Sequence, residues 1–453
     1  MRIALPAEIT RRLNASPWAY RLAHGAAWSL LGSVISRGLM LIAYIAVARL
    51  LGKEGFGEFG IIQSTVAMFG ILTGFGLGQT ATRFVAELRL RDPARAGRII
   101  ALSEGVAAAT GAIGAFFFLI AAPWLASHAL AAPHLTNVLR LGSLLLLFGA
   151  MQGAQTGVLS GFEAFRAITI ISIATGATTF VLTCTGAWYG GVMGTVLGQS
   201  IGLGVNVMVN HWQLRRIAAA ANVCVSYRDC RREWSVLWTF SLPATLCGAI
   251  VTPVMWVGNA LLVNQKMGYN EMGLFNAANQ WRTAILFLPI VFAQPFYPVL
   301  ASIAERAHEA RFKKILGLCV LGTTATALIP GIVVICLAGL IMRAYGASFD
   351  DKGSVLILIV TATVLAAPTV GLLHGINARN RAWHAFYLTL GWAISFLASL
   401  AVFSRRGAQG LAWAYVISYA AQLLLFGAYA IRFAGRVRGR HCERPDAASL
   451  AVK

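Results

Sequence analysis

Long apolar segments recur from one end of this chain to the other, and they constrain its fold more than any other feature. A helix needs about 20 apolar residues to cross the hydrocarbon core of a bilayer, at roughly 1.5 Å per residue. With 58% hydrophobic and 12% charged residues, these 453 residues carry more apolar surface than a soluble protein of this length buries. The segments are continuous in Leu, Ala, Ile and Gly and do not alternate, which favours helices.

The segments predict an all-α polytopic membrane protein with twelve transmembrane helices. The expected spans are 25–51, 56–82, 98–122, 138–160, 165–185, 189–211, 236–263, 273–299, 314–341, 353–375, 383–403 and 408–432.

Basic residues are concentrated in alternate loops. If the N-terminus is inside, the inner segments hold 27 of the 37 Lys and Arg residues and the outer loops hold six. This asymmetry follows the positive-inside rule and predicts that both termini lie in the cytoplasm. It also accounts for the net charge of +21, so nucleic acid is not an expected partner.

A short motif occurs twice. The stretch GFGEFG at 55–60 corresponds to GYNEMG at 268–273, and Lys53 corresponds to Lys266. Both copies lie in an outer loop that opens an even-numbered span, which predicts two parallel six-helix repeats. The expected division is a cytoplasmic segment 1–24, an N-terminal lobe 25–211, a cytoplasmic connector 212–235, a C-terminal lobe 236–432 and a basic cytoplasmic tail 433–453.

The motif alone has a simpler structural interpretation. It is consistent with a tight outer turn in which the glycines adopt positive φ and the glutamate caps the next helix. The motif by itself therefore does not indicate a function.

The stretch 48–87, ARLLGKEGFGEFGIIQSTVAMFGILTGFGLGQTATRFVAE, resembles the N-terminal hallmark of polysaccharide flippases of the O-antigen exporter type, within the multidrug/oligosaccharidyl-lipid/polysaccharide exporter superfamily. The resemblance implies a V-shaped pair of six-helix lobes in which spans 1, 2, 7 and 8 line a central cavity. It implies translocation of a polyprenyl-pyrophosphate-linked saccharide from the inner to the outer leaflet of the bacterial inner membrane. It also implies membrane lipid, a polysaccharide polymerase and glycosyltransferases as partners.

Two arginines lie near the middle of predicted spans. Arg37 is about 18 Å from the inner end of span 1, and Arg282 is about 14 Å from the outer end of span 8. An arginine at that depth usually faces water or a partner. Neither has a basic counterpart in the other repeat, so we expect both to bind the pyrophosphate of the substrate. The further candidate substrate-binding residues are Arg49, Gln63, Asn276, Asn279 and Gln280.

Acidic residues are scarce inside the spans. Glu104 is the one that falls well within a span, so Glu104 and His374 are the candidates for coupling transport to an ion gradient. A cation exporter needs buried carboxylates, so this scarcity disfavours a multidrug or other small-molecule exporter, which remains the main alternative. A membrane-embedded polysaccharide polymerase or ligase is the other alternative, and it would need a larger outer catalytic loop than the sequence offers.

The sequence predicts no enzymatic activity, no catalytic residues, no metal site and no cofactor. The seven cysteines are scattered singly, without the spacing of a metal site, and we expect all of them to be free thiols.

Overall fold

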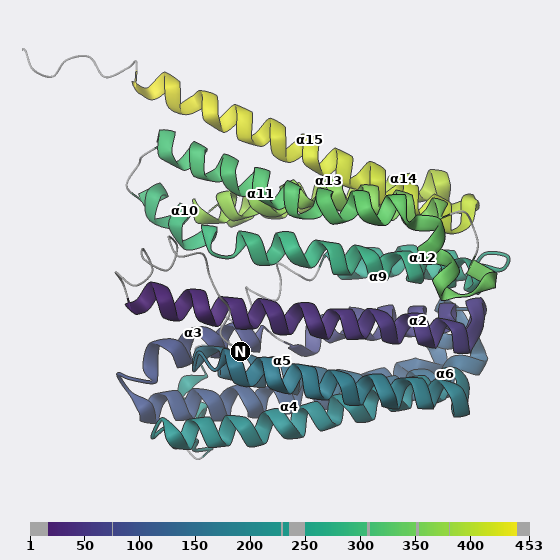
Figure 1. Cartoon of the computed structure of the whole chain (residues 1–453), viewed down its shortest axis with the longest axis horizontal. Helices are drawn as coiled ribbons and strands as arrows, with labels where there is room; N and C mark the ends of the chain where they lie inside the picture. Colours follow the sequence, from purple (N-terminus) through teal and green to yellow (C-terminus); the bar gives the residue numbers. More distant parts are fainter. Residues whose placement is uncertain are drawn as a thin grey trace, which may run out of the picture. The chain divides into compact units, whose positions relative to one another are not determined.

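The computed structural model describes residues 17–74, 76–227, 230–234, 250–305, 309–349, 353–379 and 381–441. Throughout these ranges the regular secondary structure is helical (Figure 1). The chain forms two compact units, one of Met1–Ala277 with Ala344–Phe349, and the other of Ala278–Arg343 with Asp350–Lys453.

Unit 1 contains the longest helices. Its elements are α2 (Pro17–Gly74), α3 (Leu77–Leu88), α4 (Pro93–Trp124), α5 (Thr136–Gly161), α6 (Phe165–Ala220), α8 (Val251–Val263) and the start of α9 (Gly268–Ala293), with the short helices η1 (Leu125–Ala129), η2 (Pro133–Leu135), η3 (Cys230–Glu233) and η5 (Ala347–Phe349). The helix α2 packs on α4, α5 and α6, and α5 also contacts α3, α4 and α6. The core of this unit combines small and aliphatic side chains with the buried rings of Phe56, Phe59 and Phe118.

Unit 2 contains the rest of α9, α10 (Phe296–Glu305), α11 (Glu309–Cys336), most of α12 (Ala338–Tyr345), α13 (Ser354–Ala378), α14 (Ala382–Phe403), η6 (Ser404–Arg406) and α15 (Gly407–His441). In this unit α13 packs between α11 and α15, and α14 packs on α15 (Figure 1). Aromatic contacts hold α14 to α15, since Phe396 lies edge-on against Tyr415, with ring centroids 5.1 Å apart.

Eleven of the twelve predicted spans fall on helices, although 56–82, 273–299 and 314–341 are each divided between two, and 236–263 is described from residue 250 onward. Within the described residues, seven helical stretches are long and apolar enough to cross a membrane, and each of the longest three includes residues of two predicted spans. Each of those three has a break, at Gly52 and at Ser404–Arg406 where loops were expected, and at Gly190–Gly191 just inside the predicted span 189–211. The chain is therefore an all-α, multi-pass membrane protein.

The repeated motif is not a turn, so that expectation was wrong. Residues 53–60 are helical in α2, and the positive φ of 71° belongs to Gly52, just before the motif. The second copy opens α9 with Glu271 in its first turn. Gly57 and Gly273 therefore serve helix packing, because a side chain on either would meet the backbone of the other helix.

Of the seven cysteines, Cys247 and Cys442 lie outside the described residues. The other five are free thiols, as predicted.

Candidate functional site

Unit 1 encloses a cavity of about 310 Å³ among α2, α5 and α6. Fifteen residues line it, and none is charged. Nine of them carry neutral hydrogen-bonding groups: Ser36, Tyr44, Gln152, Ser172, Thr175, Thr179, Thr183, Gln199 and Asn206. Aromatic rings of Tyr44, Phe59 and Phe180 complete the lining. Neutral donors and acceptors beside aromatic faces suit a polar, uncharged ligand group.

Asn206 is the centre of a hydrogen-bond network at this cavity. Its Nδ2 donates to the Thr175 hydroxyl at 2.6 Å, and its Oδ1 accepts from Gln152 at 3.0 Å and from Asn210 at 2.6 Å. Asn206 is 8% exposed, so these bonds satisfy a buried amide and fix its orientation. The network joins α5 to both halves of α6.

Two hydroxyl groups at the cavity form no hydrogen bond within the described residues. The hydroxyls of Ser36 and Thr183 are buried and have no hydrogen-bond partner in the described part of the chain. A buried hydroxyl without a partner costs free energy unless water or a ligand satisfies it. These two groups are therefore open to a ligand in the cavity.

Among the predicted residues, Gln63 belongs to this region, since its side-chain amide donates to Gln199, a cavity-lining residue of α6. Arg37 does not line the cavity, although its neighbour Ser36 does, and its side chain is exposed on α2. Sequence reasoning missed Gln199, Asn206 and Asn210. Their spacing of seven and four residues, on one helix face within an apolar span, was the available signal.

Arg282 lies in unit 2 and is half-buried on α9. Its Nε donates to Asn279 Oδ1 at 2.7 Å, and its guanidinium lies 5.4 Å from the ring centroid of Tyr415. It also forms a side-chain hydrogen bond with Tyr419. All these partners are neutral, and no carboxylate in the described residues forms an ion pair with Arg282. Its positive charge is therefore uncompensated within this part of the chain.

The other predicted polar residues of α9 divide between the units. Asn276 belongs to unit 1, is 5% exposed, and donates to the Phe56 carbonyl oxygen at 3.4 Å. Asn279 and Gln280 belong to unit 2 and are half-buried. The structure thus brings Asn279 to Arg282, whereas Asn276 serves the packing of α9 on α2.

Arg49 lies at the end of the first half of α2. Its Nε donates to the backbone carbonyl of Ala344 at 2.6 Å, within unit 1. This bond ties the Ala344–Phe349 segment to α2, where Phe56 also contacts the rings of Tyr345 and Phe349.

Glu104 is the centre of a buried polar cluster, and it is 7% exposed. His211 Nδ1 donates to one carboxylate oxygen at 2.9 Å, and the Tyr227 hydroxyl donates to the other at 3.2 Å. Arg215 lies 3.7 Å from the second oxygen and donates to Tyr227 at 2.8 Å. Burial and the neighbouring Glu104 raise the pKa of Tyr227 above its ordinary value of 10.0, so the hydroxyl stays protonated at neutral pH.

His374, the other coupling candidate, is half-buried on α13. Its Nδ1 lies 2.8 Å from the Val370 carbonyl oxygen, and because a carbonyl only accepts, Nδ1 carries the hydrogen.

Comparisons with known proteins agree with this architecture. A family model described as polysaccharide biosynthesis protein matches residues 22–304. The EPS I polysaccharide export inner membrane protein EpsE of Ralstonia nicotianae is 24% identical over 396 residues, covering 86% of this chain and 89% of that protein.

Solved transporter structures share the fold. An inward-facing multidrug resistance MATE family transporter of the MOP superfamily aligns with a TM-score of 0.78 and 16% identity, covering 91% of this chain and 99% of the other. The lipid II flippase MurJ, in an inward closed conformation, aligns with a TM-score of 0.67 and 14% identity, covering 89% of this chain and 87% of the other. Because the family model covers more than half of its residues, this chain belongs to the polysaccharide biosynthesis protein family.

Proposed function

We propose that this protein is a flippase that moves a polyprenyl-pyrophosphate-linked saccharide from the inner to the outer leaflet of the bacterial cytoplasmic membrane by alternating access. The relative from Ralstonia nicotianae is named as a polysaccharide export inner membrane protein, and MurJ as a lipid II flippase. The first name describes polysaccharide export and the second describes the flipping of a lipid-linked molecule, and both support a lipid-linked saccharide as the substrate.

The observation that carries the proposal is the neutral, hydrogen-bonding cavity of unit 1. A saccharide presents many hydroxyl groups and no charge, so it needs donors and acceptors rather than ions. The hydroxyls of Ser36 and Thr183 supply unused hydrogen-bonding capacity, and the ring of Phe180 supplies an apolar face. Arg282 supports the same substrate class, because an uncompensated guanidinium suits a pyrophosphate.

A multidrug exporter for cations is less consistent with these residues. Such a transporter needs a carboxylate exposed to its substrate, whereas the oxygens of Glu104 are already engaged by His211, Tyr227 and Arg215. The named relatives are exporters and transporters, so we also propose no enzymatic role.

The test is to fill the cavity. Gly176 lines it, and a Cβ atom there would meet no other atom within 4 Å, so Gly176→Leu adds a side chain without a backbone clash. We expect normal protein abundance, loss of polysaccharide at the cell surface and accumulation of lipid-linked saccharide inside. Gly105→Leu is the matched control, because Gly105 is exposed on α4 and also meets nothing within 4 Å.

In a second pair of variants, each substitution removes a single hydroxyl group. Thr183→Val should reduce export severalfold, since one neutral hydrogen bond contributes about 0.5–1.5 kcal/mol. Thr185→Val should have little effect, because Thr185 is exposed and its hydroxyl bonds only to its own helix. Normal export by an abundant Gly176→Leu protein would show that the substrate does not use this cavity, and it would contradict the proposal.

A further inference from the structure

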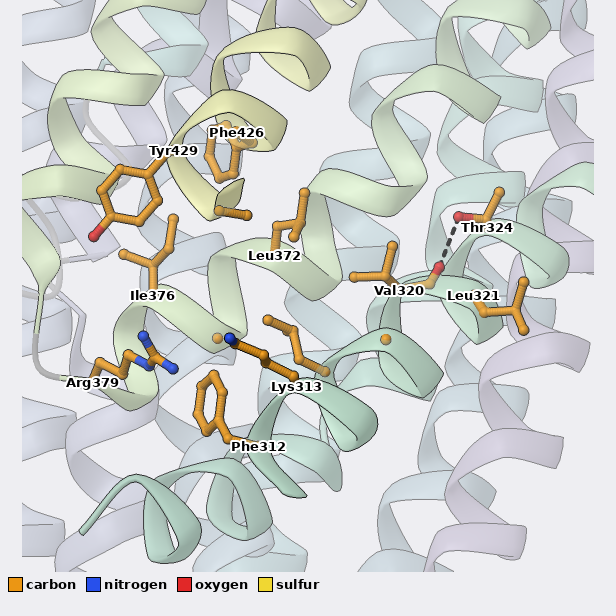
Figure 2. A pocket seen from close by; sticks show the side chains of 14 residues that line it. Phe312, Lys313, Val320, Leu321, Thr324, Leu372, Ile376, Arg379, Phe426 and Tyr429 are labelled. Carbon is orange, nitrogen blue, oxygen red and sulfur yellow. Dashed lines mark hydrogen bonds between the residues drawn. The ribbon is translucent and has the colours of Figure 1, made fainter. Parts of the chain in front are cut away.

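Unit 2 encloses a second and larger cavity, of about 480 Å³, among α11, α13 and α15 (Figure 2). Its walls are largely apolar, with Leu316, Val320, Leu321, Leu372, Ile376 and Phe426 among them. Nothing in the proposed transport mechanism uses this cavity, and the inference drawn from it does not depend on that mechanism.

The cavity has one basic end. Lys313 and Arg379 lie there beside Phe312, whereas Val320, Leu321 and Thr324 line the opposite end (Figure 2). Lys313 and Thr324 are eleven residues apart on α11. At 1.5 Å per residue the lining therefore extends over about 16 Å. An elongated apolar cavity with a charged mouth matches an amphipathic ligand.

The charge at the mouth is only partly neutralised. Arg379 donates to both carboxylate oxygens of Glu309, at 3.1 and 2.8 Å, and its guanidinium stacks 4.1 Å from the Phe312 ring centroid. Lys313 is exposed and has no ion-pair partner in the described ranges, and the same holds for its neighbour Lys314. The mouth is therefore net positive and suited to an anion.

We propose that this cavity is a binding site for an anionic glycerophospholipid of the membrane. One acyl chain occupies the apolar cavity, and the headgroup phosphate lies on the Lys313 ammonium. The mouth is formed by the start of α11 and the end of α13, which the positive-inside rule assigns to the cytoplasmic leaflet. Basic pockets between transmembrane helices on that side are suited to anionic lipid headgroups.

The lining distinguishes this occupant from the saccharide-carrying lipid. A glycan needs several free hydrogen-bonding groups, but the Thr324 hydroxyl is engaged by the Val320 carbonyl at 2.7 Å (Figure 2). Beyond the two basic residues and Thr324, Tyr429 contributes the remaining polar side chain of the lining. A compact phosphate headgroup is satisfied by this set, whereas a saccharide is not.

Gly317 allows a direct test of occupancy. It lines the cavity, and a Cβ atom there would meet no other atom within 4 Å. Gly317→Leu therefore places a side chain in the space of the acyl chain, and leucine also favours the helix over glycine. Gly339→Leu is the matched control, since Gly339 on α12 meets nothing within 4 Å and does not line the cavity.

The experiment measures the affinity of the purified full-length protein for phosphatidylglycerol in detergent, with phosphatidylcholine as the neutral comparison lipid. We expect preferential binding of phosphatidylglycerol by the wild type and by Gly339→Leu, and loss of that preference in Gly317→Leu. Lys313→Gln should weaken binding about fivefold, which corresponds to about 1 kcal/mol. Lys314→Gln, one residue along and outside the lining, should leave it within twofold.

Three results would overturn the proposal. Equal losses in Lys313→Gln and Lys314→Gln would show a diffuse surface attraction. Unchanged binding by a folded Gly317→Leu protein would show that the acyl chain does not enter the cavity. Competition by a polyprenyl phosphate at much lower concentration than phosphatidylglycerol would assign the site to the carrier lipid instead.

Discussion

A Cβ atom on Gly57 would lie 2.8 Å from the backbone nitrogen of Gly273, and it would overlap the carbonyl oxygen of Tyr269. These residues come from the two copies of the repeated motif, and they bring α2 and α9 into backbone contact within unit 1. The contact is reciprocal, because a Cβ atom on Gly273 would overlap the carbonyl oxygen of Lys53. The motif thus occurs in both helices because each needs a glycine where the other crosses it.

Gly57→Ala should destabilise the protein although alanine is the better helix former. The helix preference favours alanine by about 0.5–1 kcal/mol, whereas overpacking against a backbone costs about 1–3 kcal/mol. We expect a lower thermal unfolding temperature in detergent and reduced export. Gly38→Ala, elsewhere in α2 with nothing within 4 Å of its Cβ atom, should not lower the unfolding temperature. If both variants unfold at the same temperature, α2 and α9 do not pack closely at Gly57.

Arg282→Gln should sharply reduce export at normal abundance. A charge-assisted hydrogen bond contributes roughly 1.5–3 kcal/mol, so the expected loss of activity is about tenfold to a hundredfold. Lysine at this position should restore export only in part, because it lacks the bidentate fork. The measurement is surface polysaccharide normalised to protein level. We predict the same outcome for Arg37→Gln.

Arg405→Gln is the control for both arginines, since Arg405 is exposed in η6 and is expected in an outer loop. Normal export by the Arg282 and Arg37 variants would mean that neither guanidinium binds the substrate. Reduced abundance of the Arg282→Gln protein would instead show that the contacts with Tyr415 and Tyr419 are structural.

The spans were predictable because a bilayer imposes both length and hydrophobicity on the sequence. The breaks within the spans were harder to predict from the sequence. The single span expected at 273–299 is two helices, α9 and α10, bent by 42° at a break before Phe296. Pro295 lies at that break and lacks the N–H that a continuous helix needs. The predicted span 314–341 is likewise divided between α11 and α12 at Leu337.

The candidate site was predictable only where a single residue was unusual in its own span. Arg282 and Glu104 stood out because charge is costly in an apolar segment. Asn206 did not, because an isolated amide in a span is a common packing residue, and its partners Gln152 and Thr175 are 54 and 31 residues away. Cavities depend on such distant pairings, which one sequence does not reveal.

The orientation of the chain is a prediction that labelling can test. In a cysteine-free background, cysteine introduced at Lys53 or Lys266 should react with an impermeant thiol reagent added to intact cells. Cysteine at Arg91 or Arg216 should react only after the membrane is opened. Labelling of both pairs from the same side would contradict the assignment of inner and outer loops.

The contacts of Glu104 indicate an anchor for the connector, because its oxygens already accept from His211 and Tyr227 and one lies near Arg215. Glu233 supports the same interpretation, since it is buried in η3 and pairs with Arg95 and Arg98 of α4. Two carboxylates thus tie the region 212–235 to α4.

Glu104→Gln should therefore loosen the connector rather than alter the response to a proton gradient. Removing the charge leaves Arg215 without its counter-ion, at a cost of about 1–3 kcal/mol. We expect faster trypsin cleavage within 212–235 and lower export at every external pH, with an unchanged pH profile. Tyr227→Phe, which removes only one donor, should accelerate cleavage less. If Glu104→Gln instead leaves cleavage unchanged and abolishes the dependence of export on external pH, then Glu104 is the coupling residue and its three contacts must open during transport.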